Sequence, residues 1–197
     1  ALVSAIDILI GGTGTDVVTL GTAGNTVLVR GIETLAGLTG TDVVTLGNTF
    51  NSLLVSGIET LTGGTATDIV NLGTAGNTMV VSGIETLIGN GSGTDIITIG
   101  TAGGTLLALG IETVIGGTGL EIIFTGTAGS ALTVSGADFV IGNTGTDVLT
   151  LGSAGNTTTI RGIETLIGNG SGTDIITIGT AGGTLLALGI ETPAATR

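Results

Sequence analysis

The carboxylates of Asp and Glu are the side chains of this sequence that could perform the most chemistry. The chain has 15 Asp and Glu residues against three Arg, and it contains no Cys, His, Lys, Tyr, Trp or Gln. Thiol nucleophiles, imidazole bases, Schiff-base lysines and the soft ligands of zinc or copper are therefore missing. The chemistry that remains is mainly binding through oxygen atoms, and we predict that the protein is not an enzyme.

All 15 acids fall into two columns when the chain is aligned on its recurring Gly-Ile-Glu-Thr segment. The first column contains Asp7, Glu33, Glu59, Glu85, Glu112, Asp138, Glu164 and Glu191. The second contains Asp16, Asp42, Asp68, Asp95, Glu121, Asp147 and Asp174. Equivalent residues of stacked strands would lie about 4.8 Å apart. Each column would then be a ladder of like charges that needs water, hydrogen-bond donors or cations.

The second column is the better candidate for a metal site, because each of its acids follows a glycine-rich turn. In the segment from Gly11 to Asp16, exposed backbone carbonyls and a carboxylate would form an all-oxygen site of the kind that suits Ca²⁺. The alternative is that each acid accepts N–H bonds from its own turn. We predict calcium at the second column. For the first, we expect carboxylates that bond turn amides or reach solvent.

The elements that position these acids follow from the repeat. Its copies start at Gly31, Gly57, Gly83, Gly110, Gly136, Gly162 and Gly189, with a spacing of 26 or 27 residues. Such a period, combined with Val, Ile, Leu and Thr, predicts a solenoid of stacked strands. Residues 83–113 and 162–192 are identical, which suggests that 1–197 is one continuous repeat domain and a fragment of a longer array.

Each repeat holds three short apolar segments, for example Ile32 to Ala36, Asp42 to Leu46 and Ser52 to Val55. We therefore predict an all-β, parallel β-solenoid of about seven coils, with three strands in each coil and every strand stacked on its own copy. Alternation along the strands places the columns that begin with Val18 and Leu20 in the core.

One outward column is unusual for a monomer in water, because all of its members are β-branched and apolar. It contains Val17, Val43, Ile69, Ile96, Ile122, Val148 and Ile175. Such a column suits lateral assembly or an apolar partner. It could equally reflect β-propensity alone, or a face that a neighbouring segment covers.

The glycine-rich turns resemble a known family. The segment Gly-Gly-Thr-Gly-Thr-Asp-Val-Val-Thr (Gly11 to Thr19) is similar to the nonapeptide of RTX, or haemolysin-type calcium-binding, repeats. The resemblance implies a right-handed β-roll or β-helix, export from a bacterium by a type I route, and Ca²⁺ between successive turns. The form is degenerate, since only the first copy keeps the full Gly-Gly-x-Gly-x-Asp pattern, and the column that begins with Thr26 contains no acid.

The net charge of −12 opposes binding to nucleic acid or anionic lipid, and glycine interrupts every apolar run, so we expect no membrane insertion. We predict a structural, self-associating protein, secreted or on a bacterial cell surface, as a fibre, surface layer, biofilm matrix or adhesin stalk. Its expected partners are further copies, lateral or end to end, and calcium ions.

Three alternatives stay open at this point. One is an RTX-type calcium-binding module for folding or secretion, attached to a functional domain outside this sequence. Another is an ice- or crystal-binding face built from pairs such as Val17/Thr19, Val43/Thr45 and Ile96/Thr98, which Asn71 and Phe124 interrupt. The third is a polysaccharide-cleaving β-helix, because acids alone can hydrolyse glycosides.

Overall fold

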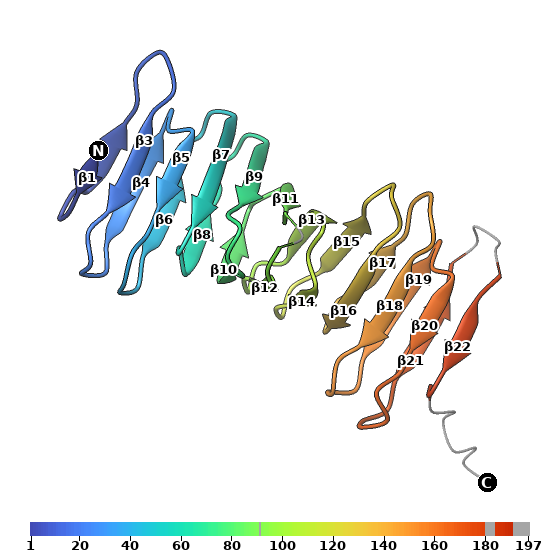
Figure 1. The fold of residues 1–197 in the computed structure, drawn as a ribbon. Helices are drawn as coiled ribbons and strands as arrows, with labels where there is room; N and C mark the ends of the chain where they lie inside the picture. Colours follow the sequence, from blue (N-terminus) through green and yellow to red (C-terminus); the bar gives the residue numbers. More distant parts are fainter. Residues whose placement is uncertain (91, 180–183, 191–197) are drawn as a thin grey trace, which may run out of the picture.

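The computed structural model describes residues 1–90, 92–179 and 184–190. These residues form 22 β-strands and no helix. The strands build two parallel sheets of 11 strands each, and Figure 1 shows them as one long stack from the N-terminal to the C-terminal end. The predicted all-β parallel solenoid is confirmed.

The odd-numbered strands form sheet A, in which each strand pairs only with the odd strands before and after it. In stack order they are β1 (Leu2–Val3), β3 (Val17–Leu20), β5 (Thr34–Ala36), β7 (Asn51–Ser56), β9 (Asp68–Leu72), β11 (Thr86–Ile88), β13 (Gly104–Leu109), β15 (Glu121–Thr125), β17 (Phe139–Ile141), β19 (Thr157–Arg161) and β21 (Ile175–Ile178).

The even-numbered strands form sheet B in the same way. They are β2 (Ile8–Ile10), β4 (Thr26–Arg30), β6 (Val43–Leu46), β8 (Thr60–Thr62), β10 (Thr78–Ser82), β12 (Ile96–Ile99), β14 (Thr113–Ile115), β16 (Ala131–Ser135), β18 (Val148–Leu151), β20 (Thr165–Ile167) and β22 (Leu186–Leu188). The chain alternates between the two sheets, so one coil consists of one strand from each.

The predicted seven coils with three strands per coil are therefore wrong, because there are about 11 coils with two strands each. Along one edge, Asn25, Asp42, Glu59 and Asn77 occupy successive coils at intervals of 17, 17 and 18 residues. Two sequence repeats thus fill three coils. A 26-residue repeat is one and a half coils, and its copies alternate between the sheets.

This arrangement also overturns the expected stacking of each strand on its own copy. Val43 in β6 pairs with Thr26 of β4 on one side and with Thr60 of β8 on the other. The three strand types of the repeat therefore follow one another within each sheet. The right-handed sense of the coil stays a prediction.

The core lies between the sheets and consists of one apolar side chain layer from each. Val44, Val70, Ile97 and Ile123 are fully buried, as alternation predicted. A buried Val or Leu contributes about 1.5–3 kcal/mol relative to an exposed one. The last member of the second core column, Ile178, is the exception, with 66% of its surface exposed.

Glycine is required where turns of neighbouring coils meet. A Cβ added to Gly63 would lie 1.7 Å from the carbonyl oxygen of Gly83 in the next coil on that edge. Gly83 in turn adopts φ +62°, in the left-handed region that favours glycine. These glycines allow backbone to pack on backbone, which brings the turn side chains of successive coils within hydrogen-bonding distance.

Candidate functional site

The predicted pure ladders of like acids do not form, because equivalent acids alternate between the two edges of the stack. Each edge instead cycles through Asp, Glu and a third residue, most often Asn. In stack order, edge 1 carries Asp16, Glu33, Asn51, Asp68, Glu85, Gly104, Glu121, Asp138, Asn156 and Asp174. Edge 2 carries Asp7, Asn25, Asp42, Glu59, Asn77, Asp95, Glu112, Ser130, Asp147 and Glu164. Glu191 lies outside the described residues.

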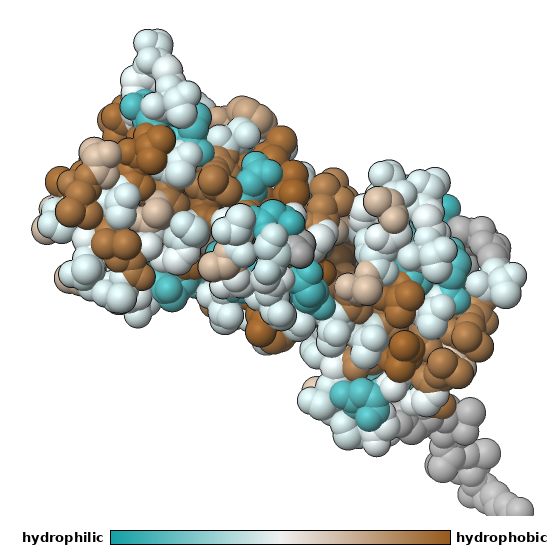
Figure 2. All heavy atoms as spheres, viewed as in Figure 1, coloured by the Kyte–Doolittle hydropathy of each residue, from teal (hydrophilic) through white to brown (hydrophobic). Residues whose placement is uncertain are grey.

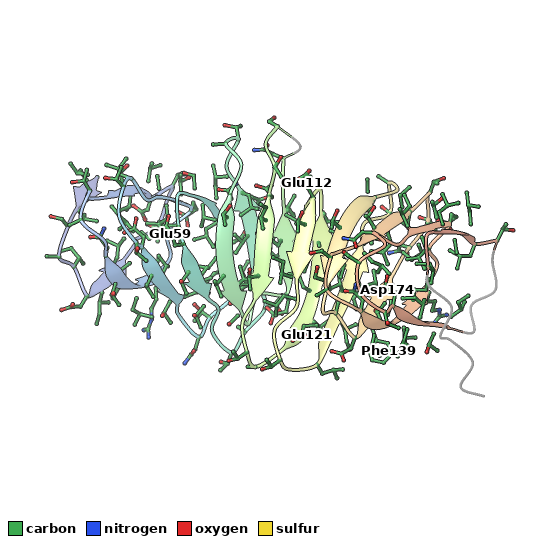
Figure 3. All side chains as sticks on the ribbon, turned by 90° about the horizontal axis from the view of Figure 1, so that it is seen from below. Glu59, Glu112, Glu121, Phe139 and Asp174 are labelled. Carbon is green, nitrogen blue, oxygen red and sulfur yellow. The ribbon has the colours of Figure 1, made fainter. Side chains whose placement is uncertain are left out.

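Figure 3 shows the two edges on opposite sides of the stack, with Glu112 on one and Glu121 on the other. The expectation that all second-column acids share a single edge is therefore wrong. Asp16, Asp68, Glu121 and Asp174 lie on edge 1, and Asp42, Asp95 and Asp147 lie on edge 2.

Four of the Asp residues accept hydrogen bonds from an asparagine of the preceding coil, an interaction that we call the Asn clamp. Asn25 donates to Oδ1 of Asp42 twice, from its backbone N–H at 2.9 Å and from Nδ2 at 2.7 Å. The same Nδ2 is 3.1 Å from the carbonyl oxygen of Gly21 and 2.7 Å from that of Ala23, in its own turn. One amide therefore closes its own turn and binds the next coil.

The contact between Asn Nδ2 and Asp Oδ1 recurs for four pairs at 2.7–2.9 Å, namely Asn25/Asp42, Asn51/Asp68, Asn77/Asp95 and Asn156/Asp174. In three of the acidic turns the Oδ2 oxygen accepts an N–H from the turn of the Asp itself, at 2.8 Å for Asp16, 2.9 Å for Asp68 and 3.3 Å for Asp147. Asp42 differs, because its Oδ2 is buried without a partner. The alternative to calcium, in which an acid accepts N–H bonds from its own turn, is observed at Asp16, Asp68 and Asp147.

The Glu that follows each Asp binds the backbone, as one reading of the first column predicted. Glu59 Oε2 accepts the amide N–H of Asp42 at 2.7 Å, and Glu33, Glu85, Glu112 and Glu164 make the same bond to their preceding acids. These glutamates are more exposed than the buried aspartates. Two bonds therefore link three successive coils. The Asn side-chain amide donates to the Asp carboxylate, and the Asp backbone N–H donates to the Glu carboxylate.

The Asn residues were not recognised from the sequence, although they form a visible column. They occupy the last position of Gly-Thr-Ala-Gly-Asn and related turns, one residue before the column that begins with Thr26 and contains no acid. Asn25, Asn51, Asn77 and Asn156 are 3–8% exposed, and such deeply buried amides require partners.

The positions of these amides show whether the edges can hold the calcium ions that the RTX resemblance implies. Asn25 Nδ2 stands among three oxygen atoms, two carbonyls and one carboxylate, at hydrogen-bonding distances. A cation bound to those oxygens would compete with the amide for the same place, so the four Asn-linked sites do not fit calcium. In the part of the chain that the structure describes, no group of three or more acids is placed to hold a metal ion.

Two turns in the described part of the chain lack the asparagine and are built differently. Gly104 and Ser130 replace it, and the preceding Gly103 and Gly129 adopt φ +73° and +79°. Near Ser130, the hydroxyl of Thr125 donates to Asp147 Oδ1 at 3.2 Å and takes over the missing bond.

No such replacement serves Glu121, the acid that follows Gly104. Its side chain is 1% exposed, and among the described residues both carboxylate oxygens lack a hydrogen-bond partner. Burial raises the pKa of Glu121 above 4.5, and the nearby Asp138 carboxylate raises it further. The amides of Gly117 and Gly119 offset part of this increase, although neither reaches hydrogen-bonding geometry.

The outer faces of the sheets are the second candidate site. The predicted outward column is confirmed as outward, with Val17 and Ile175 about half exposed and the other five partly buried by their neighbours. Its members are divided between the sheets, since Val17 lies in β3 and Val43 in β6. Figure 2 shows apolar side chains recurring along the length of the visible side of the stack.

The predicted Val/Thr array is also divided between the sheets. Val17 and Thr19 belong to sheet A, whereas Val43/Thr45 and Ile96/Thr98 belong to sheet B. The two interruptions, Asn71 and Phe124, lie in β9 and β15 of sheet A. Sheet B has an outward Thr on every strand from β6 to β20: Thr45, Thr60, Thr62, Thr78, Thr98, Thr113, Thr133, Thr150 and Thr165.

The chain matches no protein-family model, no curated protein and no solved structure. The similarity to RTX repeats therefore stays a prediction from the turn residues. None of the described residues belongs to a helix that could cross a membrane.

The Asn clamp is tested by Asn51→Ala, with the exposed Asn48 of the same turn as the control position. The variant removes bonds of 2.6–3.0 Å to Gly47 O, Thr49 O and the buried Asp68 Oδ1. We expect the free energy of unfolding in urea to fall by about 1–3 kcal/mol. Asn48→Ala should change it by less than about 0.5 kcal/mol. Equal losses for the two variants would show that the amide does not link the coils.

Proposed function

We propose that the protein is a structural solenoid that associates with further copies of itself through the faces of its sheets. The observation that carries this proposal is the distribution of charge. Every described acid lies in a turn or at the first residue of a strand, on one of the two edges. The outward strand positions carry two charged side chains, Arg30 and Arg161, in the described part of the chain.

The chemistry of parallel sheets supports association through these faces. Parallel sheets are usually covered on both sides, whereas a sheet face that remains in water normally carries polar residues. Here the outward positions hold mainly Val, Ile, Leu, Phe and Thr, with a few Ala, Ser and Asn residues and the two Arg residues. Two solenoids that packed face to face would bury apolar area, while the acids at the edges would stay hydrated.

The proposed setting is a fibre, surface layer, biofilm matrix or adhesin stalk outside a bacterial cell. The similarity of Gly11 to Thr19 to RTX repeats supports export, and the repetitive coil suits a mechanical or spacing role. The protein then acts through surface area and length, without a reaction centre.

Self-association is tested by sedimentation velocity over a wide range of protein concentration, together with electron microscopy. We expect particles larger than a monomer at high concentration, elongated in images. Added NaCl should strengthen association, because it screens the net charge of −12 and does not weaken apolar contacts. A monomer at every concentration and salt level would contradict the proposal.

A second candidate, a calcium-stabilised module, is favoured by one carboxylate. Glu121 is buried without hydrogen-bond partners, faces Asp138, and lies next to the coil in which Gly104 leaves open the space of an Asn side chain. Of the seven acids predicted to bind calcium, Glu121 therefore fits a cation best. Oxygen ligands of this kind suit Ca²⁺.

The variant Glu121→Gln distinguishes the loss of stability caused by the buried charge from a gain of stability caused by bound calcium. A raised pKa means that the folded state binds the proton more tightly than the unfolded chain does, so wild-type stability falls as the pH rises above about 4.5. At pH 7 without calcium, the variant should melt about 2–4 °C higher than wild type, and the difference should vanish at low pH. Calcium should raise the Tm of wild type and should leave that of Glu121→Gln unchanged.

The matched control for this comparison is Glu59→Gln, which alters a partly exposed Glu whose Oε2 is already bonded to the Asp42 amide. It should remain as responsive to calcium as wild type. A Tm that calcium does not change in wild type would rule out the calcium-stabilised module and leave the structural proposal intact.

A further inference from the structure

The middle of sheet A carries the largest side chains found on either outer face. Between β11 and β17, the outward positions include Ile88, Leu107, Ile122, Phe124, Phe139 and Ile141, which we call the apolar patch. Two of the three Phe residues of the chain belong to it. Phe139 is 37% exposed, and Figure 3 shows where it lies on the stack.

The strand register makes the apolar patch continuous. Leu107, Phe124 and Ile141 are direct neighbours across β13, β15 and β17, and Ile122 pairs with Phe139 beside them. Ile88 joins through its neighbour Leu109. Neighbours in a parallel sheet are about 4.8 Å apart, so these side chains contact one another and leave their outer surfaces to water.

The described central strands of sheet B carry no equivalent patch. On its central strands each outward apolar residue has a Thr beside it, as for Val80 between Thr60 and Thr98. The described outward positions of sheet B contain no aromatic residue. The two faces of the solenoid are therefore chemically different, although they are built from the same repeat.

We propose that two copies of the chain pair through sheet A, related by a two-fold axis that passes through the apolar patch. This inference rests on the proposed self-association and adds the face and the symmetry. Two twisted sheets would pack face to face about 10 Å apart, as in a β-sandwich.

The distribution of large and small side chains favours a second copy as the occupant. The aromatic residues of the apolar patch lie on β15 and β17 together with Ile122 and Ile141, whereas its residues on β11 and β13, Ile88 and Leu107, are aliphatic. A two-fold axis that runs parallel to the strands between β13 and β15 places Phe124 of each copy over Leu107 of the other, and β17 with Phe139 over β11. Such an interface is self-complementary, as two-fold contacts must be.

Area and charge are consistent with this pairing. A two-fold axis between β13 and β15 overlaps the eight strands from β7 to β21. At about 4.8 Å per strand and a strand length of about four residues, the contact measures roughly 38 by 13 Å, or about 500 Å² per copy before side-chain relief. A standard interface uses about 800 Å² per partner, so the area is that of a weak, concentration-dependent dimer. Arg161 on β19 would lie over β9, whose outward residues Ile69 and Asn71 carry no charge.

The face is tested by sedimentation velocity on the full chain with Phe124→Ser/Phe139→Ser. The matched control is Val80→Ser/Ile115→Ser on sheet B, where the side chains are 39% and 37% exposed. We expect the first variant to weaken dimerisation about 30-fold or more and the control to weaken it less than about threefold. Circular dichroism of both variants verifies the fold.

A tryptophan reporter keeps the test decisive if the Ser variant does not fold. The chain has no Trp or Tyr, so Phe139→Trp introduces a single fluorophore. Its emission should shift to the blue as concentration rises, while that of Val80→Trp should not. Two results would overturn the sheet A interface and leave self-association standing. One is association in which only the emission of Val80→Trp shifts to the blue. The other is association that is lost in Val80→Ser/Ile115→Ser but not in Phe124→Ser/Phe139→Ser. Wild type that stays monomeric would overturn both.

Discussion

The structure depends on how the polar groups of its turns are satisfied when coils stack. A stack of identical acidic turns would place carboxylates about 4.8 Å apart with nothing between them. The solenoid avoids this by mixing three turn types on each edge, so that an Asn amide precedes each typical Asp, and a Glu bonded to the backbone follows it. The amide takes a role that a cation could fill, because it supplies donors to two carbonyls and one carboxylate at once. Glu121, which has no such amide, shows the consequence, since its buried carboxylate stays unpaired and its pKa is raised.

The same arrangement separates the edges from the faces. Because the acids are held in the turns, the strands are free to carry apolar and threonine side chains outward without charge. A chain with a net charge of −12 therefore has two nearly uncharged sheet faces. That combination suits a protein whose copies pack side by side while its edges stay in water. The repeat length adds a further effect. Because one repeat spans one and a half coils, equivalent strands of successive repeats lie in opposite sheets. Sequence differences between repeats can therefore make the two faces chemically different.

Much of this could be predicted from the sequence. Period-two alternation identified the buried columns of Val44 and Leu46 and the outward column of Val43, because burial depends on the strand alone. The number of strands per coil could not be obtained this way, since the repeat length gives the number of strands per repeat and not where the chain returns to its starting face. That error placed like acids on neighbouring coils and hid the pairing of Asn25 with Asp42, which are 17 residues apart. An Asn column next to a turn was the available signal.

The two-strand coil is the central claim, and engineered cysteine pairs test it directly, because the native chain contains no Cys. Thr45 and Thr62 are partners on adjacent strands of sheet B, so Cα atoms about 5 Å apart can be bridged by a disulfide. Thr45 and Asn71 occupy equivalent positions of successive repeats and lie in opposite sheets. In dilute protein oxidised before mass spectrometry, Thr45→Cys/Thr62→Cys should form an intramolecular disulfide, and Thr45→Cys/Asn71→Cys should not. A disulfide that forms only in the second variant would contradict the account, because it would mean that repeats stack directly on their own copies.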